Sequence, residues 1–145
     1  MIKYLNQSIL WIILAIVILL CFLYACSGKY INKRSNNKNK PTYQIITAAE
    51  AYQMMQKLNK FVLLDVRTNE EFLEKHIDGA ILIPSHEIEN RVEIEIPDKN
   101  TVILIYCRSG ARASSAAKIL VGKGYMQVFN FGGIINWPYA TVSGK

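Results

Sequence analysis

The alternation of short apolar runs with capped, helix-like segments after residue 42 constrains this fold more than any other feature. Three runs are almost continuously apolar: 61–66 (F-V-L-L-D-V), 81–83 (I-L-I) and 101–106 (T-V-I-L-I-Y). Strands that are buried on both faces of a parallel sheet have this composition, whereas half-exposed strands alternate apolar and polar residues. We therefore predict an α/β fold with a central parallel sheet flanked by helices.

Shorter β-prone runs at 42–46 and 126–131 complete the expected set of five strands. Between the strands, Thr and Glu three residues apart form two capping-box patterns, which predict helices starting near residues 47 and 68. Further helices are expected within 85–95 and over the alanine-rich segment 110–121. A last short helix is expected to begin with Gly132, Gly133 and Ile134 and to run towards Trp137, a core residue.

The candidate for the chemistry of this chain is Cys107, which follows the run 101–106 directly and opens the segment C-R-S-G-A-R. Binding sites of parallel sheets lie beyond the carboxyl ends of the strands. A cysteine in that crevice lies next to backbone N–H groups and the positive end of a helix, and both favour the thiolate. Arg108 and Arg112 add two permanent positive charges within the same turn. A small buried hydrophobe is the alternative interpretation of this cysteine.

The residues that follow Cys107 are small enough for the loop to curl and to aim its amides at one point, which makes an anion cradle. We therefore predict an activated nucleophile, Cys107, in a pocket suited to an oxyanion or a sulfur anion. The predicted substrate- or anion-binding loop consists of Arg108, Ser109, Gly110, Ala111 and Arg112.

The chain resembles the rhodanese-like family over residues 42–140. The matching strings are L-D-V-R-T-N-E-E-F (64–72), H-I-D-G-A-I-L-I-P (76–84), Y-C-R-S-G-A-R-A-S-S-A-A (106–117) and G-Y-M-Q-V-F-N-F-G-G-I-I-N-W (124–137). The resemblance implies a sulfurtransferase that needs no cofactor. Its loop cysteine, here Cys107, takes sulfane sulfur from a thiosulfate-like donor as a persulfide and yields it to cyanide or a thiol.

Two other functions remain open on this fold. Related phosphatases and arsenate reductases need a longer loop, C-x5-R, whereas Cys107 and Arg112 form C-x4-R and Ala113 stands where their arginine would be. A non-catalytic binding or redox-sensing module is the other alternative. Asp78 and Leu82 depart from the proline and asparagine that are common in the family, so fewer substrate contacts are expected.

The remaining polar candidates have supporting roles. Asp65 and Arg67 match the family's D-V-R, and an acid within an apolar strand needs a buried partner, for which Arg67 or Arg112 is available. His76 is interpreted as a turn-capping residue and His86 as plain surface. No metal is expected, because the two histidines and the distant cysteine lack the spacing of a metal site.

The N-terminal segment 1–28 is expected to be a membrane element. Residues 9–25 are apolar without interruption and show no helical stripe, and the uncharged flanks bring the stretch to a spanning length of about 20 residues. An uncleaved anchor, a lipoprotein signal with Cys26 as the lipidated residue and a simple cleaved signal all remain open. The string L-Y-A-C at 23–26 resembles a bacterial lipobox, although its tyrosine does not fit.

The charge of the chain, +6 overall, is concentrated at this end. Six of the 17 basic residues lie within residues 1–41 and none of the 11 acidic ones does, so the rest of the chain is balanced. We interpret 29–41 as a basic linker, 42–140 as a single, monomeric domain and 141–145 as a tail. The basic residues after the apolar run favour a cytoplasmic domain. Nucleic-acid binding is not expected, because the linker lacks interleaved aromatic residues.

Overall fold

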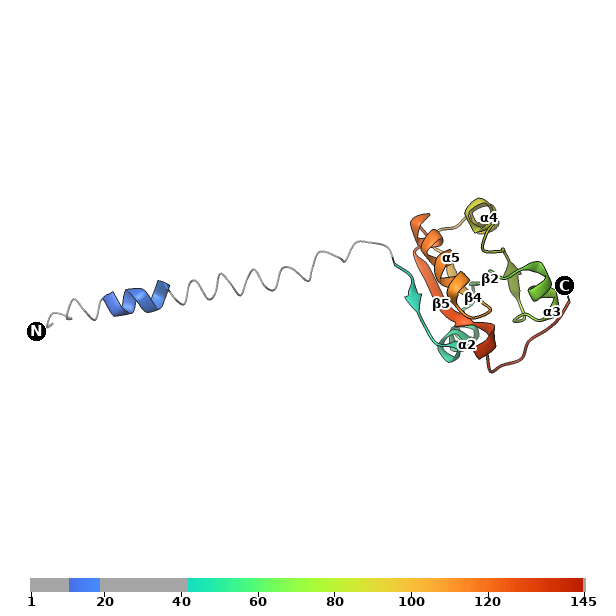
Figure 1. The fold of residues 1–145 in the computed structure, drawn as a ribbon, viewed down its shortest axis with the longest axis horizontal. Coiled ribbons are helices and arrows are strands. Elements are labelled where there is room, and N and C mark those ends of the chain that lie inside the picture. Colours follow the sequence, from blue (N-terminus) through green and yellow to red (C-terminus); the bar gives the residue numbers. More distant parts are fainter. Residues whose placement is uncertain (1–10, 19–41, 145) are drawn as a thin grey trace, which may run out of the picture. The chain divides into compact units, whose positions relative to one another are not determined.

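The computed structural model describes residues 11–18 and 42–144 (Figure 1), which belong to two units and are treated separately. Residues 11–18 are helical and their side chains are exposed. Within the described residues, no helix has both the length and the apolar character needed to cross a membrane. Most of the predicted membrane segment, the predicted linker 29–41 and Cys26 lie outside the described residues, so the membrane element stays a prediction.

Residues 42–144 form an α/β domain around one parallel sheet, as predicted. All five predicted strands form, and their order in the sheet is β1-β5-β4-β2-β3. The strands are β1 (Gln44–Ile45), β2 (Val62–Asp65), β3 (Ala80–Leu82), β4 (Val102–Cys107) and β5 (Gln127–Gly133). The helices are α2 (Ala48–Lys57), α3 (Asn69–Glu74), α4 (Ile88–Glu95), α5 (Ala111–Gly122) and the 3-10 turn η2 (Ile134–Asn136).

The central strand β4 is buried on both faces, which explains its continuous apolar sequence. Ile103, Ile105 and Cys107 belong to the core layer that includes residues of α4 and α5. Leu104 and Tyr106 alternate with them and belong to the layer on the other face, with residues of α2 and η2. The alternation of a strand therefore places Cys107 on the α4–α5 face of the sheet.

Both predicted capping boxes are confirmed, and both fix the entry to a helix. The Thr47 side chain accepts a hydrogen bond from the Glu50 N–H at the start of α2. The Thr68 side chain does the same for Glu71 at the start of α3. In each box the glutamate also accepts from the backbone N–H of the threonine, so two otherwise unpaired donors are satisfied at each helix.

The prediction that Gly132 and Gly133 begin the last helix was wrong, because both belong to β5. Ile105 pairs with Asn130 and Cys107 pairs with Gly133, so β5 carries one residue more than β4 across this interval. This is a β-bulge, and Gly132 has a φ of +87°, which only glycine adopts readily. Two adjacent glycines can be read from the sequence, but whether they form a bulge depends on how β5 pairs with β4, which the sequence of β5 alone does not show.

The predicted tail contributes to the domain. The backbone of Val142 forms two hydrogen bonds with that of His76, each 2.8 Å long. The N–H of Gly144 donates to the Leu73 carbonyl at 2.8 Å, near the end of α3. These bonds tie residues 142–144 to the segment that joins α3 to β3.

Candidate active site

Cys107 lies at the base of the loop that joins β4 to α5. The backbone N–H of Gly110 donates a hydrogen bond to the Cys107 Sγ at 3.0 Å, so the loop curls back over the sulfur. Gly110 has a φ of +109°, which permits this reversal. Cys107 is only 1% exposed, so the sulfur is enclosed by the loop and the core rather than open in a crevice as expected.

The start of α5 makes the neighbourhood of the sulfur suited to an anion. The helix begins at Ala111 without a side-chain cap, so the N–H groups of its first turn have no partner within the helix. Such unpaired amides and the positive end of the helix dipole both favour negative charge. The Gly110 N–H and the amides at the start of α5 are thus the donors available for the predicted anion cradle.

The bulge of β5 supports the loop from the other side. A Cβ on Gly133 would overlap the Arg108 carbonyl and would lie 2.6 Å from the Ser109 Cα, so the loop packs directly on this glycine. The N–H of Ile135 also donates to the Arg108 carbonyl at 3.3 Å. The Arg108 carbonyl, which faces η2, belongs to the same peptide group as the Ser109 N–H. Because this peptide is trans, its C=O and N–H point in opposite directions, so the Ser109 N–H is directed away from η2. Sequence reasoning missed this support.

Arg112 forms a bidentate ion pair with Glu71 at the start of α3. The two contacts are Nη1 to Oε2 at 2.6 Å and Nη2 to Oε1 at 2.8 Å. Hydrogen bonding to Arg112 lowers the pKa of Glu71 to about 2, and the same pair raises the pKa of Arg112. Sequence analysis assigned Glu71 only to a helix cap, because nothing in a local pattern links residues 41 positions apart.

The two loop arginines therefore differ in a way that the sequence does not indicate. The charge of Arg112 is compensated by Glu71, and Cys107 contributes less than Glu71 to the raised pKa of Arg112. Arg108 is exposed and forms no ion pair within residues 42–144. Arg108 is thus the loop cation whose charge is free to attract an anion from solution.

The predicted supporting pair is confirmed, with Arg67 and not Arg112 as the partner of Asp65. Asp65 is fully buried. The Arg67 Nε donates to both of its carboxylate oxygens, and the Arg67 Nη2 donates to Oδ2 at 2.6 Å. Burial lowers the pKa of Arg67, but the hydrogen bonds and charge of Asp65 raise it by more. Arg67 Nη2 also donates to the Lys75 carbonyl, which ties the end of β2 to the end of α3.

The histidines take the structural roles that the sequence predicts. His76 stacks on the Phe72 ring, and its Nδ1 lies 2.8 Å from the Phe72 carbonyl in the last turn of α3. His86 is exposed beside Glu87. Trp137 is buried against Phe131. Across residues 11–18 and 42–144, no group of three His, Cys, Asp or Glu side chains is placed to hold a metal ion.

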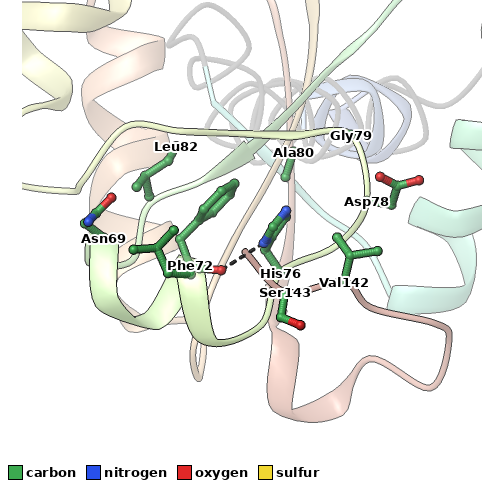
Figure 2. A pocket seen from close by; sticks show the side chains of 10 residues that line it. Asn69, Phe72, His76, Asp78, Gly79, Ala80, Leu82, Val142 and Ser143 are labelled. Carbon is green, nitrogen blue, oxygen red and sulfur yellow. Dashed lines mark hydrogen bonds between the residues drawn. The ribbon is translucent and has the colours of Figure 1, made fainter. Parts of the chain in front are cut away.

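A cavity of about 680 Å³ lies between α3, β3 and residues 142–143 (Figure 2). Figure 2 shows the stacked Phe72 and His76 rings on one side of it and Val142 on another. Asp78 and Leu82, two positions at which the chain departs from the family pattern, also line this cavity. Cys107 and its loop do not line it, so the chemistry described above takes place elsewhere.

We predict that the Glu71–Arg112 pair contributes stability that is lost in acid. The carboxylate has a lower pKa in the folded chain than in the unfolded chain. Its contribution is therefore complete above about pH 4.5 and disappears as the pH falls towards 2. With allowance for solvent screening, we expect Glu71→Gln to lower the unfolding free energy at pH 7 by about 1–2 kcal/mol.

Urea unfolding of both proteins at a series of pH values measures this difference. Glu89→Gln is the matched control, because Glu89 lies on the exposed face of α4 and forms no ion pair within residues 42–144. A difference between wild type and Glu71→Gln that stays constant from pH 7 to pH 2.5 would contradict the prediction.

A cysteine at the end of a central parallel strand, under a loop of backbone amides at the start of a helix, is an arrangement suited to group transfer through a thiol nucleophile. Comparison with known proteins specifies the class further. The family model described as rhodanese-like domain matches residues 47–138, and the chain belongs to this family. It is a rhodanese-like sulfurtransferase.

Two curated relatives and one solved structure illustrate the similarity. The chain is 37% identical over 81 residues to the thiosulfate sulfurtransferase PspE of Escherichia coli. The matched residues make up 56% of this chain and 78% of the relative. It is 44% identical over 77 residues to a sulfurtransferase of Allochromatium vinosum, and the matched residues make up 52% of this chain and 70% of that relative. A solved structure described as a rhodanese with anions from E. coli is 36% identical, with a TM-score of 0.54, over 57% of this chain and 98% of that one.

Proposed function

We propose that the protein moves sulfane sulfur from thiosulfate, or a donor like it, to cyanide or a thiol through a persulfide on Cys107. The observation that carries this proposal is the hydrogen bond from the Gly110 N–H to the Cys107 Sγ at the uncapped start of α5. A sulfur anion in this position is stabilised by a backbone donor and by the helix dipole. The name of the E. coli relative supports thiosulfate as the donor.

The reaction consists of two displacements at sulfur. The Cys107 thiolate attacks the outer sulfur of thiosulfate, the S–S bond of thiosulfate breaks, and sulfite leaves with the electron pair. The acceptor then attacks the outer sulfur of the persulfide, and the Cys107 thiolate leaves with the electrons of that bond. The leaving thiolate carries its charge on the Cys107 Sγ, which accepts the Gly110 N–H, whereas the persulfide anion carries its charge mainly on the outer sulfur, one bond further out.

The persulfide is the intermediate that tests this proposal. After treatment of the full chain with thiosulfate, we expect mass spectrometry to find one added sulfur atom on the peptide that contains Cys107. Cyanide should remove that atom and release thiocyanate. A folded chain that gains no sulfur from thiosulfate or from other sulfane donors would support a non-catalytic binding or redox-sensing module instead.

Arg108 is proposed to recruit the anionic donor. It is exposed in the loop and its charge is not compensated by an acidic partner within the described domain. We expect Arg108→Ala to raise KM for thiosulfate about fivefold to tenfold and to change kcat by less, because the charge acts on binding of the dianion. Steady-state kinetics at low and high salt measure this effect, which should shrink as salt screens the charge.

Arg108→Lys is the matched variant, since it keeps the charge and loses only the guanidinium geometry. It should recover most of the affinity. An Arg108→Ala enzyme with unchanged KM at low salt would show that the donor is bound without this side chain.

Membrane tethering of the domain is proposed from the sequence. The apolar run 9–25 and the basic segment that follows it support an anchor with a cytoplasmic domain. Export as a lipoprotein that carries lipid on Cys26 is the alternative. Fractionation of cells that express the full chain should place it with the membranes, and protease added to intact cells should spare a cytoplasmic domain. Recovery of the intact chain in the soluble fraction would refute tethering.

A further inference from the structure

One buried polar side chain lies beside the bulge that supports the reactive loop. Asn130 on β5 is 3% exposed, and both ends of its amide are used. Its Oδ1 accepts from the Gly132 N–H at 2.9 Å, and its Nδ2 donates to the Ser114 Oγ at 3.0 Å. The orientation of the amide is fixed, because the backbone N–H of Gly132 can only donate and must therefore face the oxygen.

These two hydrogen bonds join the two flanks of the loop. The bond to Gly132 closes the turn of the β5 bulge, in which Gly132 has its positive φ. The bond to Ser114 reaches the first turn of α5, where the Ser114 N–H donates its helical hydrogen bond to the Gly110 carbonyl. Asn130 is therefore the side chain that ties the bulge to the helix, and the Cys107 loop spans the interval between them.

The position of the bulge determines how the loop amides are directed. Gly133 packs against the backbone of Arg108 and Ser109, and the Ile135 N–H holds the Arg108 carbonyl. This contact turns the Ser109 N–H away from η2. A shift of the bulge would move Gly133, against which the backbone of Arg108 and Ser109 packs, and would therefore disturb the peptide that carries that amide.

We propose that Asn130, together with Ser114, is a positioning residue that sets the orientation of the loop amides around the sulfur of Cys107. The proposal rests on the sulfur-transfer function proposed above and extends it to residues that contact neither Cys107 nor, as we infer, the substrate. Asn130 is proposed to do more than stabilise the core, because its two hydrogen bonds fix the β5 bulge against which the Cys107 loop packs. Loss of the Asn130 amide should therefore slow sulfur uptake in protein that is still folded.

Three single variants of the full chain, and the double variant Asn130→Leu/Ser114→Ala, test the proposal. Asn130→Leu keeps a similar volume and removes both hydrogen bonds, Ser114→Ala removes one, and Ser114→Thr keeps the hydroxyl. Val128→Ala is the control for stability, because Val128 is buried on the same strand and belongs to the core rather than to the loop support. All are assayed at a temperature at which thermal melting shows them to be folded.

We expect Asn130→Leu to lower kcat/KM for thiosulfate about tenfold, because the half-buried Gly132 N–H loses its acceptor beside the loop. Ser114→Ala should lower it about threefold, and Ser114→Thr should restore it to about the wild-type value. The double variant should lose less than the product of the single effects, since both residues act through one contact. Val128→Ala should lower the melting temperature without this kinetic loss.

A second measurement does not depend on sulfur transfer. The rate at which iodoacetate alkylates Cys107, divided by the rate for neutral iodoacetamide, reports how well the loop accepts an anion. Peptide mass spectrometry assigns the label to Cys107. Asn130→Leu should lower this ratio about threefold or more, whereas Val128→Ala should leave it unchanged.

The two measurements separate failure of the positioning role from failure of the proposed function. A wild-type chain that takes no sulfur from any donor refutes the proposed function, and the alkylation ratio then still decides the role of Asn130. An Asn130→Leu chain that retains the wild-type alkylation ratio, with kcat/KM within about twofold of the wild type where turnover is measurable, overturns the positioning role.

Discussion

Replacement of Cys107 by serine is expected to abolish sulfur transfer and to leave the domain folded. A serine hydroxyl is close in size to the thiol and can still accept the hydrogen bond from the Gly110 N–H, so the core and the loop keep their packing. It cannot form a persulfide, because it has no sulfur atom, and its neutral hydroxyl is a poor nucleophile towards sulfane sulfur. We expect a loss of at least about 10³-fold in thiocyanate formation from thiosulfate and cyanide.

The matched control replaces the other two cysteines, Cys21 and Cys26, which lie outside the described residues. That double variant should keep the activity of the wild type and should carry the added sulfur on Cys107. Circular dichroism should give closely similar melting curves for all three proteins. Equal activity of wild type and Cys107→Ser would overturn the assignment of Cys107 as the sulfur carrier.

Much of this domain was predictable from local sequence patterns, because strand burial, helix capping and contacts between near neighbours depend on residues that are close together in the chain. Continuous apolar runs predicted three of the parallel strands and shorter β-prone runs predicted the other two, and threonine–glutamate pairs predicted the starts of α2 and α3. The loop motif predicted the Gly110 contact in general terms, since a curled loop after a strand brings its amides towards the preceding side chain. Asp65 and Arg67 were predictable as a pair because they are two residues apart on the same strand end.

Contacts between distant segments set the geometry of the site and were not predictable from the sequence. The Glu71–Arg112 pair depends on how α3 approaches the loop, which no local pattern describes. The contact between Gly133 and the loop depends on one extra residue in β5, and the hydrogen bond from Asn130 to Ser114 depends on the packing of β5 against α5. The sequence thus indicates which residue reacts, whereas tertiary packing determines how its loop is held.

Introduction of a single methyl group at Gly133 is expected to have the second-largest effect on activity. A Cβ there would overlap the Arg108 carbonyl and the Ser109 backbone, and these are main-chain atoms that cannot rotate out of the way as a flexible side chain does. The loop must therefore lift away from β5 in Gly133→Ala. That movement also breaks the hydrogen bond from the Ile135 N–H to the Arg108 carbonyl. We expect kcat/KM for thiosulfate to fall about 10²-fold, as misplaced catalytic groups do elsewhere.

Gly122→Ala is the matched control for Gly133→Ala, because the same methyl group is added where no atom lies within 4 Å. Gly122 is the last residue of α5, where alanine has the higher helix propensity, so this variant should be as active as the wild type and at least as stable. The two variants should also differ in the persulfide step itself. Under single-turnover conditions Gly133→Ala should load sulfur on Cys107 slowly, whereas Gly122→Ala should load it at the wild-type rate. If Gly133→Ala is folded and loads sulfur as fast as Gly122→Ala, the loop does not depend on its contact with β5.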